Sequence, residues 1–184
     1  MPAPGTSLLN YALLALLHGR PQSGYEVRKQ FSTTPIGIFS DSPGSIYPAL
    51  VRLEKKGWIR AMGESGANPR QRRRFELTRA GLAELKRWLL QPATPLEVTS
   101  SIEALWLRCA FFDEVLGVER THRYLVDFER VLAAHVAGLR AYREQVRGRF
   151  TSSALLAFQS GVAGLEAGLR LVRRAISTYE RGLR

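Results

Sequence analysis

Four arginines lie close together in this 184-residue chain, at positions 70, 72, 73 and 74. A guanidinium group can bind phosphate through two parallel hydrogen bonds and can enter a narrow minor groove, so the cluster Arg70, Arg72, Arg73 and Arg74 is suited to contact a nucleic acid. A solvated basic loop is the alternative. The surrounding residues favour the first interpretation, because they predict a helix and a strand before the cluster and a strand beginning within it.

The helix before the arginines is predicted from its end signals and its apolar spacing. Ser45 is placed as N-cap, Pro48 is tolerated in the first turn, and Gly57 follows two lysines as a terminating glycine. Residues at steps of four and three should face the core, namely Ile46, Leu50 and Leu53. The outer side then holds Val51 and the candidate contacts to phosphates or base edges, which are Ser45, Tyr47, Arg52 and Lys55. For Tyr47, a half-buried packing role is an equal alternative.

The elements around this helix predict a winged helix-turn-helix. Strands are expected at 58–62 and 73–77, on either side of a loop with two glycines, an asparagine and a proline. An apolar helix at 7–18 should be buried, and a second helix should run from an N-cap at Ser23 to about residue 31. A fourth helix, capped by Thr78, should run to about residue 90.

A proline-rich break at 91–95 separates the predicted DNA-binding domain, 1–91, from a helical domain, 92–184. A helix at about 100–114 is followed by two long helices in which apolar residues recur at alternating steps of three and four, as in a coiled coil. The chain can reverse at 148–152, which gives an antiparallel hairpin. The fold class is therefore mainly α with a small β-hairpin. The candidate dimerisation residues are Leu125, Phe128, Leu132, His135, Leu139, Tyr142, Phe158, Val162, Leu165, Leu169, Val172 and Ile176. A seam satisfied within one chain is the alternative.

Charge and composition agree with an anionic partner. The net charge is +11, and residues 1–91 hold 14 Lys/Arg against 6 Asp/Glu, whereas 92–184 hold 13 against 10. A basic proteome with solvated arginines is the alternative. The single Cys109 excludes an internal disulfide, and no apolar run reaches the ~18–20 residues of a membrane span, so we expect a cytoplasmic protein without a membrane partner.

Catalytic and cofactor signals are weak. The three histidines are scattered over different predicted helices, none has metal-ligand spacing, and no glycine-rich loop that would cradle phosphate precedes a helix. We therefore expect no enzyme, no metal and no cofactor. Trp106 and Phe111 could line a small-molecule pocket, although core packing explains them more simply. Gly161, Gly164 and Gly168 look like a close helix-packing face.

Five segments together resemble the PadR family of transcriptional regulators: Tyr11-Ala-Leu-Leu-Ala-Leu-Leu17, Ser23-Gly-Tyr-Glu26, Gly44-Ser-Ile-Tyr-Pro-Ala-Leu50, Leu53-Glu-Lys-Lys-Gly57 and Leu77-Thr-Arg-Ala-Gly81. The segment from Gly44 to Leu50 is the most distinctive of them. The resemblance covers about residues 8–90. It implies a winged helix-turn-helix with a helical dimerisation region. It also implies repression of nearby genes, relieved by a small molecule such as a phenolic acid or a drug. The family's DNA-contacting elements fall on Tyr25, Ser45, Tyr47, Arg52 and the arginines between 70 and 74.

We therefore expect a homodimeric, sequence-specific DNA-binding regulator, acting as a repressor on a pseudo-palindromic operator in double-stranded DNA. The alternative is a winged-helix adaptor for other proteins, with only non-specific DNA affinity. No residue pattern identifies the effector.

Overall fold

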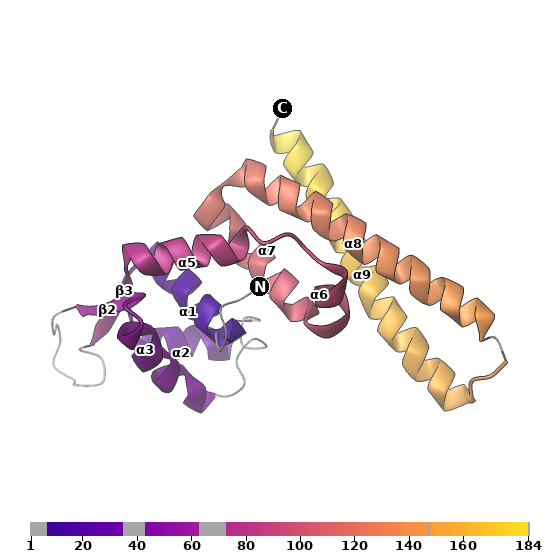
Figure 1. The fold of residues 1–184 in the computed structure, drawn as a ribbon, viewed down its shortest axis with the longest axis horizontal. Coiled ribbons are helices and arrows are strands. Elements are labelled where there is room, and N and C mark those ends of the chain that lie inside the picture. The colour runs from indigo at the N-terminus through magenta and orange to yellow at the C-terminus, as the bar shows by residue number, and fades with distance from the viewer. Residues whose placement is uncertain (1–6, 35–42, 63–72, 147, 184) are drawn as a thin grey trace. The chain divides into compact units, whose positions relative to one another are not determined.

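The computed structural model describes residues 7–34, 43–62, 73–146 and 148–183, which form two compact units (Figure 1). The first unit holds the described residues up to Gln91 together with Trp106–Leu116. The second unit holds Pro92–Leu105 and the described residues from Gly117 onward. Helix α7 (Ile102–Leu116) therefore contributes residues to both units.

The first unit combines helices with a small antiparallel sheet, as predicted. Its strands lie in the order β1-β3-β2, with Arg60 opposite Glu76 and Ser23 opposite Arg74. The sheet has one strand more than the predicted hairpin, the two-residue β1. Besides the end of α7 and a 3₁₀ turn at Pro43–Ser45, the elements are α1 (Leu8–Gly19), β1 (Gln22–Ser23), α2 (Gly24–Thr33), α3 (Ile46–Lys55), β2 (Ile59–Met62), β3 (Arg74–Leu77) and α5 (Arg79–Leu89).

Helix α1 forms the centre of this unit. Its sequence is apolar on nearly every side, and eight of its twelve residues are buried where it contacts α3, α5 and β3. Tyr11 stacks on Trp88 of α5 with the ring centroids 4.4 Å apart, and its hydroxyl donates a 2.8 Å hydrogen bond to Glu84. Partial burial alone would raise the pKa of Glu84, but hydrogen bonds from Arg87 and Tyr11 outweigh it and hold the pKa below its usual value.

The helix ends follow the predicted capping signals. Ser23 and Glu26 form a reciprocal capping box at the start of α2, and the Thr78 hydroxyl accepts a hydrogen bond from the Gly81 N–H at the start of α5. Gly57 follows α3 with a φ of +68°, in the left-handed region where glycine carries no Cβ penalty. These predictions are confirmed. Ser45 occupies the predicted N-cap position of α3, but its hydroxyl does not cap the helix, because its backbone is already helical as the last residue of the 3₁₀ turn.

The second unit is a helical hairpin with a short additional helix. The long helices α8 (Val118–Gln145) and α9 (Ser152–Gly182) lie side by side, while α6 (Pro95–Ser100) contacts α8 (Figure 1). The inner part of the predicted seam is buried within one chain, since Phe128, Leu132 and Val172 have at most 1 % exposure. Helix α9 is also long and apolar enough to cross a membrane by length and composition, although a helix of a soluble protein passes the same criterion.

Candidate nucleic-acid interface

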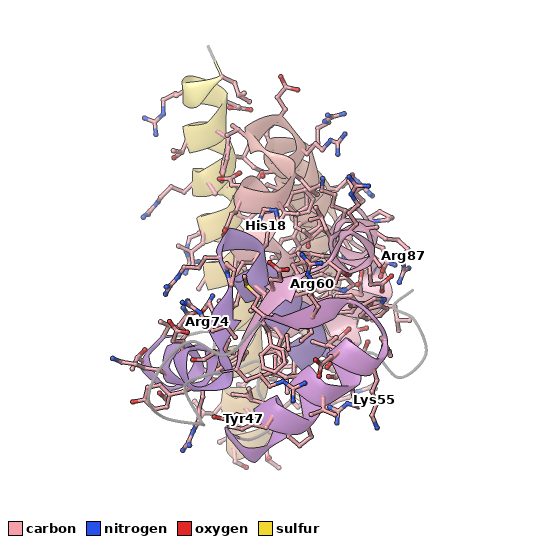
Figure 2. All side chains as sticks on the ribbon, turned by 90° about the vertical axis from the view of Figure 1, so that its left-hand side faces the viewer. His18, Tyr47, Lys55, Arg60, Arg74 and Arg87 are labelled. Atoms are coloured by element: carbon pink, nitrogen blue, oxygen red, sulfur yellow. The ribbon has the colours of Figure 1, made fainter. Side chains whose placement is uncertain are left out.

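The outer face of α3 is exposed as predicted. Tyr47 and Val51 each keep 45 % of their surface exposed, and Arg52 and Lys55 are also exposed. Figure 2 shows Tyr47 and Lys55 near opposite ends of this helix. Ile46, Leu50 and Leu53 are buried on the opposite side, so the apolar spacing in the sequence correctly separated the two faces of α3.

Helix α2 adds a second group of exposed residues. Tyr25 is 51 % exposed, and Arg28 and Lys29 are exposed three and four residues later on the same helix face. The family resemblance pointed to Tyr25, but Arg28 and Lys29 were not among the predicted contacts. Their spacing from Tyr25 was the signal that could have identified them.

Tyr47 is held against the backbone of α2. A Cβ atom on Gly24 would lie 2.6 Å from the Tyr47 Cε1, so the ring can take this position only because residue 24 is glycine. Tyr47 is therefore both a packing residue and an exposed one, and the two alternative interpretations each describe part of its surface.

Arg73 and Arg74, at the start of β3, each contact other groups of the same chain. The Arg73 Nη2 lies 2.6 and 2.8 Å from the two carboxylate oxygens of Glu54 on α3, and the guanidinium lies 5.4 Å from the Phe75 ring centroid. The Arg74 Nη2 donates to the Pro21 carbonyl at 2.7 Å and lies 3.5 Å from Glu26 on α2. The predicted contacts Arg70 and Arg72 lie outside the described residues.

These pairs leave the exposed charges of the helix-turn-helix positive. The Ser23 backbone N–H donates a hydrogen bond of 2.7 Å to the Glu26 carboxylate. This hydrogen bond and the positive charge of Arg74 lower the pKa of Glu26. The carboxylates of α2 and α3 are thus compensated by arginines. In the described part of the chain, Arg52 and Lys55 have no acidic partner.

A groove of about 550 Å³ runs along one flank of α3. Its lining is mostly apolar, and two arginines border it. The residues that line this α3 groove are Gly24, Tyr47, Pro48, Leu50, Val51, Arg52, Arg73 and Phe75.

The candidate effector residues lie in the first unit on α7. Phe111 is buried and Trp106 is half-buried, and neither lines the α3 groove. The neighbouring Arg108 is almost fully buried, with its guanidinium 5.4 Å from the Trp88 ring and a hydrogen bond to the Gln91 carbonyl. Burial raises the pKa of the Cys109 thiol to about 12, so this thiol is a poor nucleophile at neutral pH. An effector pocket at Trp106 and Phe111 stays a prediction.

The candidate dimerisation residues differ in how much surface they leave to a partner chain. The inner part of the seam is buried within one chain, whereas Tyr142, near the hairpin turn, is 48 % exposed. The buried members are Leu125, Phe128, Leu132, Leu169 and Val172. The half-buried members are His135, Leu139, Phe158, Val162, Leu165 and Ile176. No group of three or more His, Cys, Asp or Glu side chains among the described residues could hold a metal ion.

A buried first helix, a helix-turn-helix and a strand pair that extends a short β1 define a winged helix-turn-helix domain. Residues 13–87, which make up most of this domain, match the PadR-like family of transcriptional regulators. The resemblance found in the sequence is thereby confirmed over residues 13–87.

Two curated relatives match part of the chain. The probable transcriptional regulator Rv1176c of Mycobacterium tuberculosis is 31 % identical over 88 residues, 47 % of this chain and 46 % of the relative. The negative transcriptional regulator PadR of Bacillus subtilis is 30 % identical over 84 residues, 46 % of each chain. The chain thus matches about half the length of these relatives. The crystal structure of Bacillus subtilis PadR in complex with operator DNA is 20 % identical, covers 93 % of this chain and 98 % of its own, and has a TM-score of 0.43.

Proposed function

We propose that this chain is a sequence-specific, DNA-binding transcriptional repressor that acts as a homodimer. The observation that carries the proposal is the positive charge of Arg52 and Lys55 on the exposed face of α3. The carboxylates of α2 and α3 do not neutralise this charge, because they are already paired with Arg74 and Arg73. The PadR-like match over residues 13–87 and the names of the curated relatives as transcriptional regulators support it.

Helix α3 has the size and surface to enter the major groove. Its ten residues span about 15 Å, and the major groove, about 12 Å wide, admits a helix. Arg52 is assigned to a base edge and Lys55 to phosphate. The hydroxyls of Ser45, Tyr47 and Tyr25 are assigned to the DNA backbone, with Arg28 and Lys29 as further phosphate contacts. The wing arginines 70 and 72 are assigned to the backbone or minor groove, whereas Arg73 and Arg74 keep their contacts within the chain.

The dimer is assigned to the outward side of the hairpin. The inner seam is buried against its own chain, but Leu156 and Leu171 of α9 are 69 % and 58 % exposed, and an added Cβ on Gly161 or Gly164 would meet open space. A second copy packed there would make a two-fold dimer, which requires a pseudo-palindromic operator with half-sites about one helical turn, ~34 Å, or a multiple of it, apart. Release by an aromatic or drug-like effector and a cytoplasmic location are parts of the proposal that rest on the family resemblance.

An adaptor for other proteins is the second candidate function, favoured by the apolar lining of the α3 groove. Selection of bound sequences from a random duplex pool at physiological salt separates the two functions. An inverted repeat would support the dimeric regulator. Salt-sensitive binding without any motif would refute it and favour the adaptor.

A variant then tests the assignment on α3. Arg52→Ala should weaken binding to the selected sequence by about 1–3 kcal/mol and weaken binding to random DNA less. The control is Arg123→Ala, which removes an exposed arginine from α8 in the other unit and should leave both affinities unchanged. Equal losses on both DNAs would show that Arg52 contacts only phosphate.

A further inference from the structure

The outer face of α3 carries three exposed apolar side chains, Tyr47, Pro48 and Val51. We propose that this apolar patch reads the 5-methyl group of thymine in the major groove, with Val51 as its central specificity-determining residue. The inference rests on the proposed DNA-binding function and adds the chemical feature of the base that is recognised.

The patch is rigid and concave. Tyr47 is held by its contact with Gly24, and β-branched Val51 has one strongly preferred rotamer in a helix. Both residues line the α3 groove together with Pro48 and with Phe75 from the sheet. A small apolar group can therefore contact several fixed side chains at once.

The local cost of Val51 indicates that it is there for binding. Valine is a weaker helix former than alanine, lysine or glutamate, and at 45 % exposure Val51 has less packing to compensate for this than a core residue. The neighbouring exposed positions Arg52 and Lys55 carry good helix formers. An exposed valine that lowers local stability in the middle of this helix is expected where a surface serves recognition.

The charges beside the patch identify its partner as DNA. Arg52, which has no acidic partner among the described residues, lines the same groove, and Lys55 lies one turn further along α3. The partner must therefore be anionic and also offer a small apolar group. In the major groove, the C5-methyl of thymine is that group, whereas guanine, adenine and cytosine are distinguished there by hydrogen-bonding atoms.

The expected effect follows from the transfer of one methyl group out of water. Removing it should weaken binding about fourfold, which corresponds to ~0.8 kcal/mol. A two-fold dimer that buries one such methyl in each half-site should lose about 15-fold when both are removed.

Replacing each thymine of the selected sequence by deoxyuridine removes only the methyl group, and binding is measured by fluorescence anisotropy. The wild-type protein should show one thymine per half-site whose replacement weakens binding about fourfold. Val51→Ala should abolish that penalty. Val126→Ala is the matched control, because Val126 on α8 is 44 % exposed and Val51 is 45 % exposed. This variant should keep the penalty for replacing thymine by deoxyuridine.

The possible outcomes separate the inference from the function on which it rests. If every deoxyuridine duplex binds as tightly as its thymine counterpart, or if Val51→Ala keeps the full penalty, the methyl-reading role is wrong while DNA binding stands. If the wild-type protein selects no sequence, the proposed function fails and the inference with it. Thermal melting checks that Val51→Ala is folded, and Val51→Thr, which keeps the shape and loses one methyl, provides a second variant with the same expectation.

Discussion

The contact between Arg73 and Glu54 gives a prediction about the salt dependence of DNA binding. In the free protein the guanidinium is held by both carboxylate oxygens at 2.6 and 2.8 Å, so it is not available to a phosphate without giving up that contact. Both side chains are partly exposed, 57 % for Arg73 and 28 % for Glu54. Such an exposed pair contributes about 0.2–1 kcal/mol to the free energy of unfolding, so Glu54→Gln should leave the domain folded.

The effect on DNA binding should be larger than the effect on stability. Glu54→Gln releases the Arg73 guanidinium and removes a negative charge beside the DNA backbone, so affinity for every sequence should rise. One additional phosphate contact steepens the slope of log K against log salt by about 0.9. Between 50 and 200 mM salt the variant should therefore lose about 3.5-fold more affinity than the wild-type protein. Arg73→Ala alone should leave the wild-type slope unchanged.

The assay is a salt titration of operator and random duplex binding for the wild-type protein, Glu54→Gln, Arg73→Ala and the double variant. Glu166→Gln is the matched control, because the Arg140–Glu166 pair has similar exposures of 66 % and 27 % and lies in the other unit. It should change neither slope. A wild-type slope that falls by about 0.9 in Arg73→Ala, with no change in Glu54→Gln, would refute this reasoning and place Arg73 on a phosphate already.

Three further predictions concern glycines and a carboxylate. In Gly24→Ala the new Cβ would lie 2.6 Å from the Tyr47 ring, so the ring must move, and operator affinity should fall while the melting temperature changes little. In Gly81→Ala the Cβ would lie 2.0 Å from the Trp58 carbonyl oxygen, a backbone atom that cannot swing away, so urea denaturation should show a loss of more than about 3 kcal/mol. The pKa of Glu84 is lowered in the folded state, so the ionised carboxylate stabilises the fold above its ordinary pKa of 4.5. That stabilisation is lost as the pH falls below this value. Glu84→Gln should therefore flatten the acidic part of the pH–stability profile.

A glycine in open space provides the control for both alanine substitutions. Gly138 on α8 has nothing within 4 Å of an added Cβ, so Gly138→Ala should stabilise the protein by about 0.5–1 kcal/mol through helix propensity alone. An equal gain in Gly81→Ala would show that the close approach to Trp58 is relieved at no cost. An unchanged operator affinity in Gly24→Ala would remove the Tyr47 ring from the interface.

Local signals made α3 predictable. Its core face, its third-position Pro48 and its terminating Gly57 depend on spacing and on residue-specific backbone preferences, which a sequence contains directly. By contrast, helix α6 begins with a capping box of Thr94 and Glu97, a signal that is present in the sequence but starts inside the 91–95 segment interpreted as a break between domains.

The partners of the arginines could not be predicted in this way. Arg73 and Arg74 are adjacent in a run of basic residues, yet one pairs with α3 and the other with α2 and the carbonyl that precedes β1. Adjacent residues of an extended segment point to opposite sides, and the packing of the helices decides which acidic residue lies on each side. The clustering of the arginines and the family resemblance therefore predicted DNA contacts for two charges that the free protein already pairs within the chain.

The composition of α9 is explained if this helix has two apolar partners. Its most apolar 18-residue window has a mean hydropathy of 1.2, but only 11 % of that window is buried in a single chain. One side packs on α8, where the Arg140–Glu166 and Arg173–Glu129 pairs also join the two helices. A helix with α8 as its one partner would need a single apolar stripe, and Leu156 and Leu171 on the remaining surface would have no reason to be apolar. The proposed dimer supplies the second partner. It requires that Leu171→Glu weaken self-association in sedimentation measurements while the hairpin stays helical, and a variant that associates as strongly as the wild-type protein would place the dimer contact elsewhere.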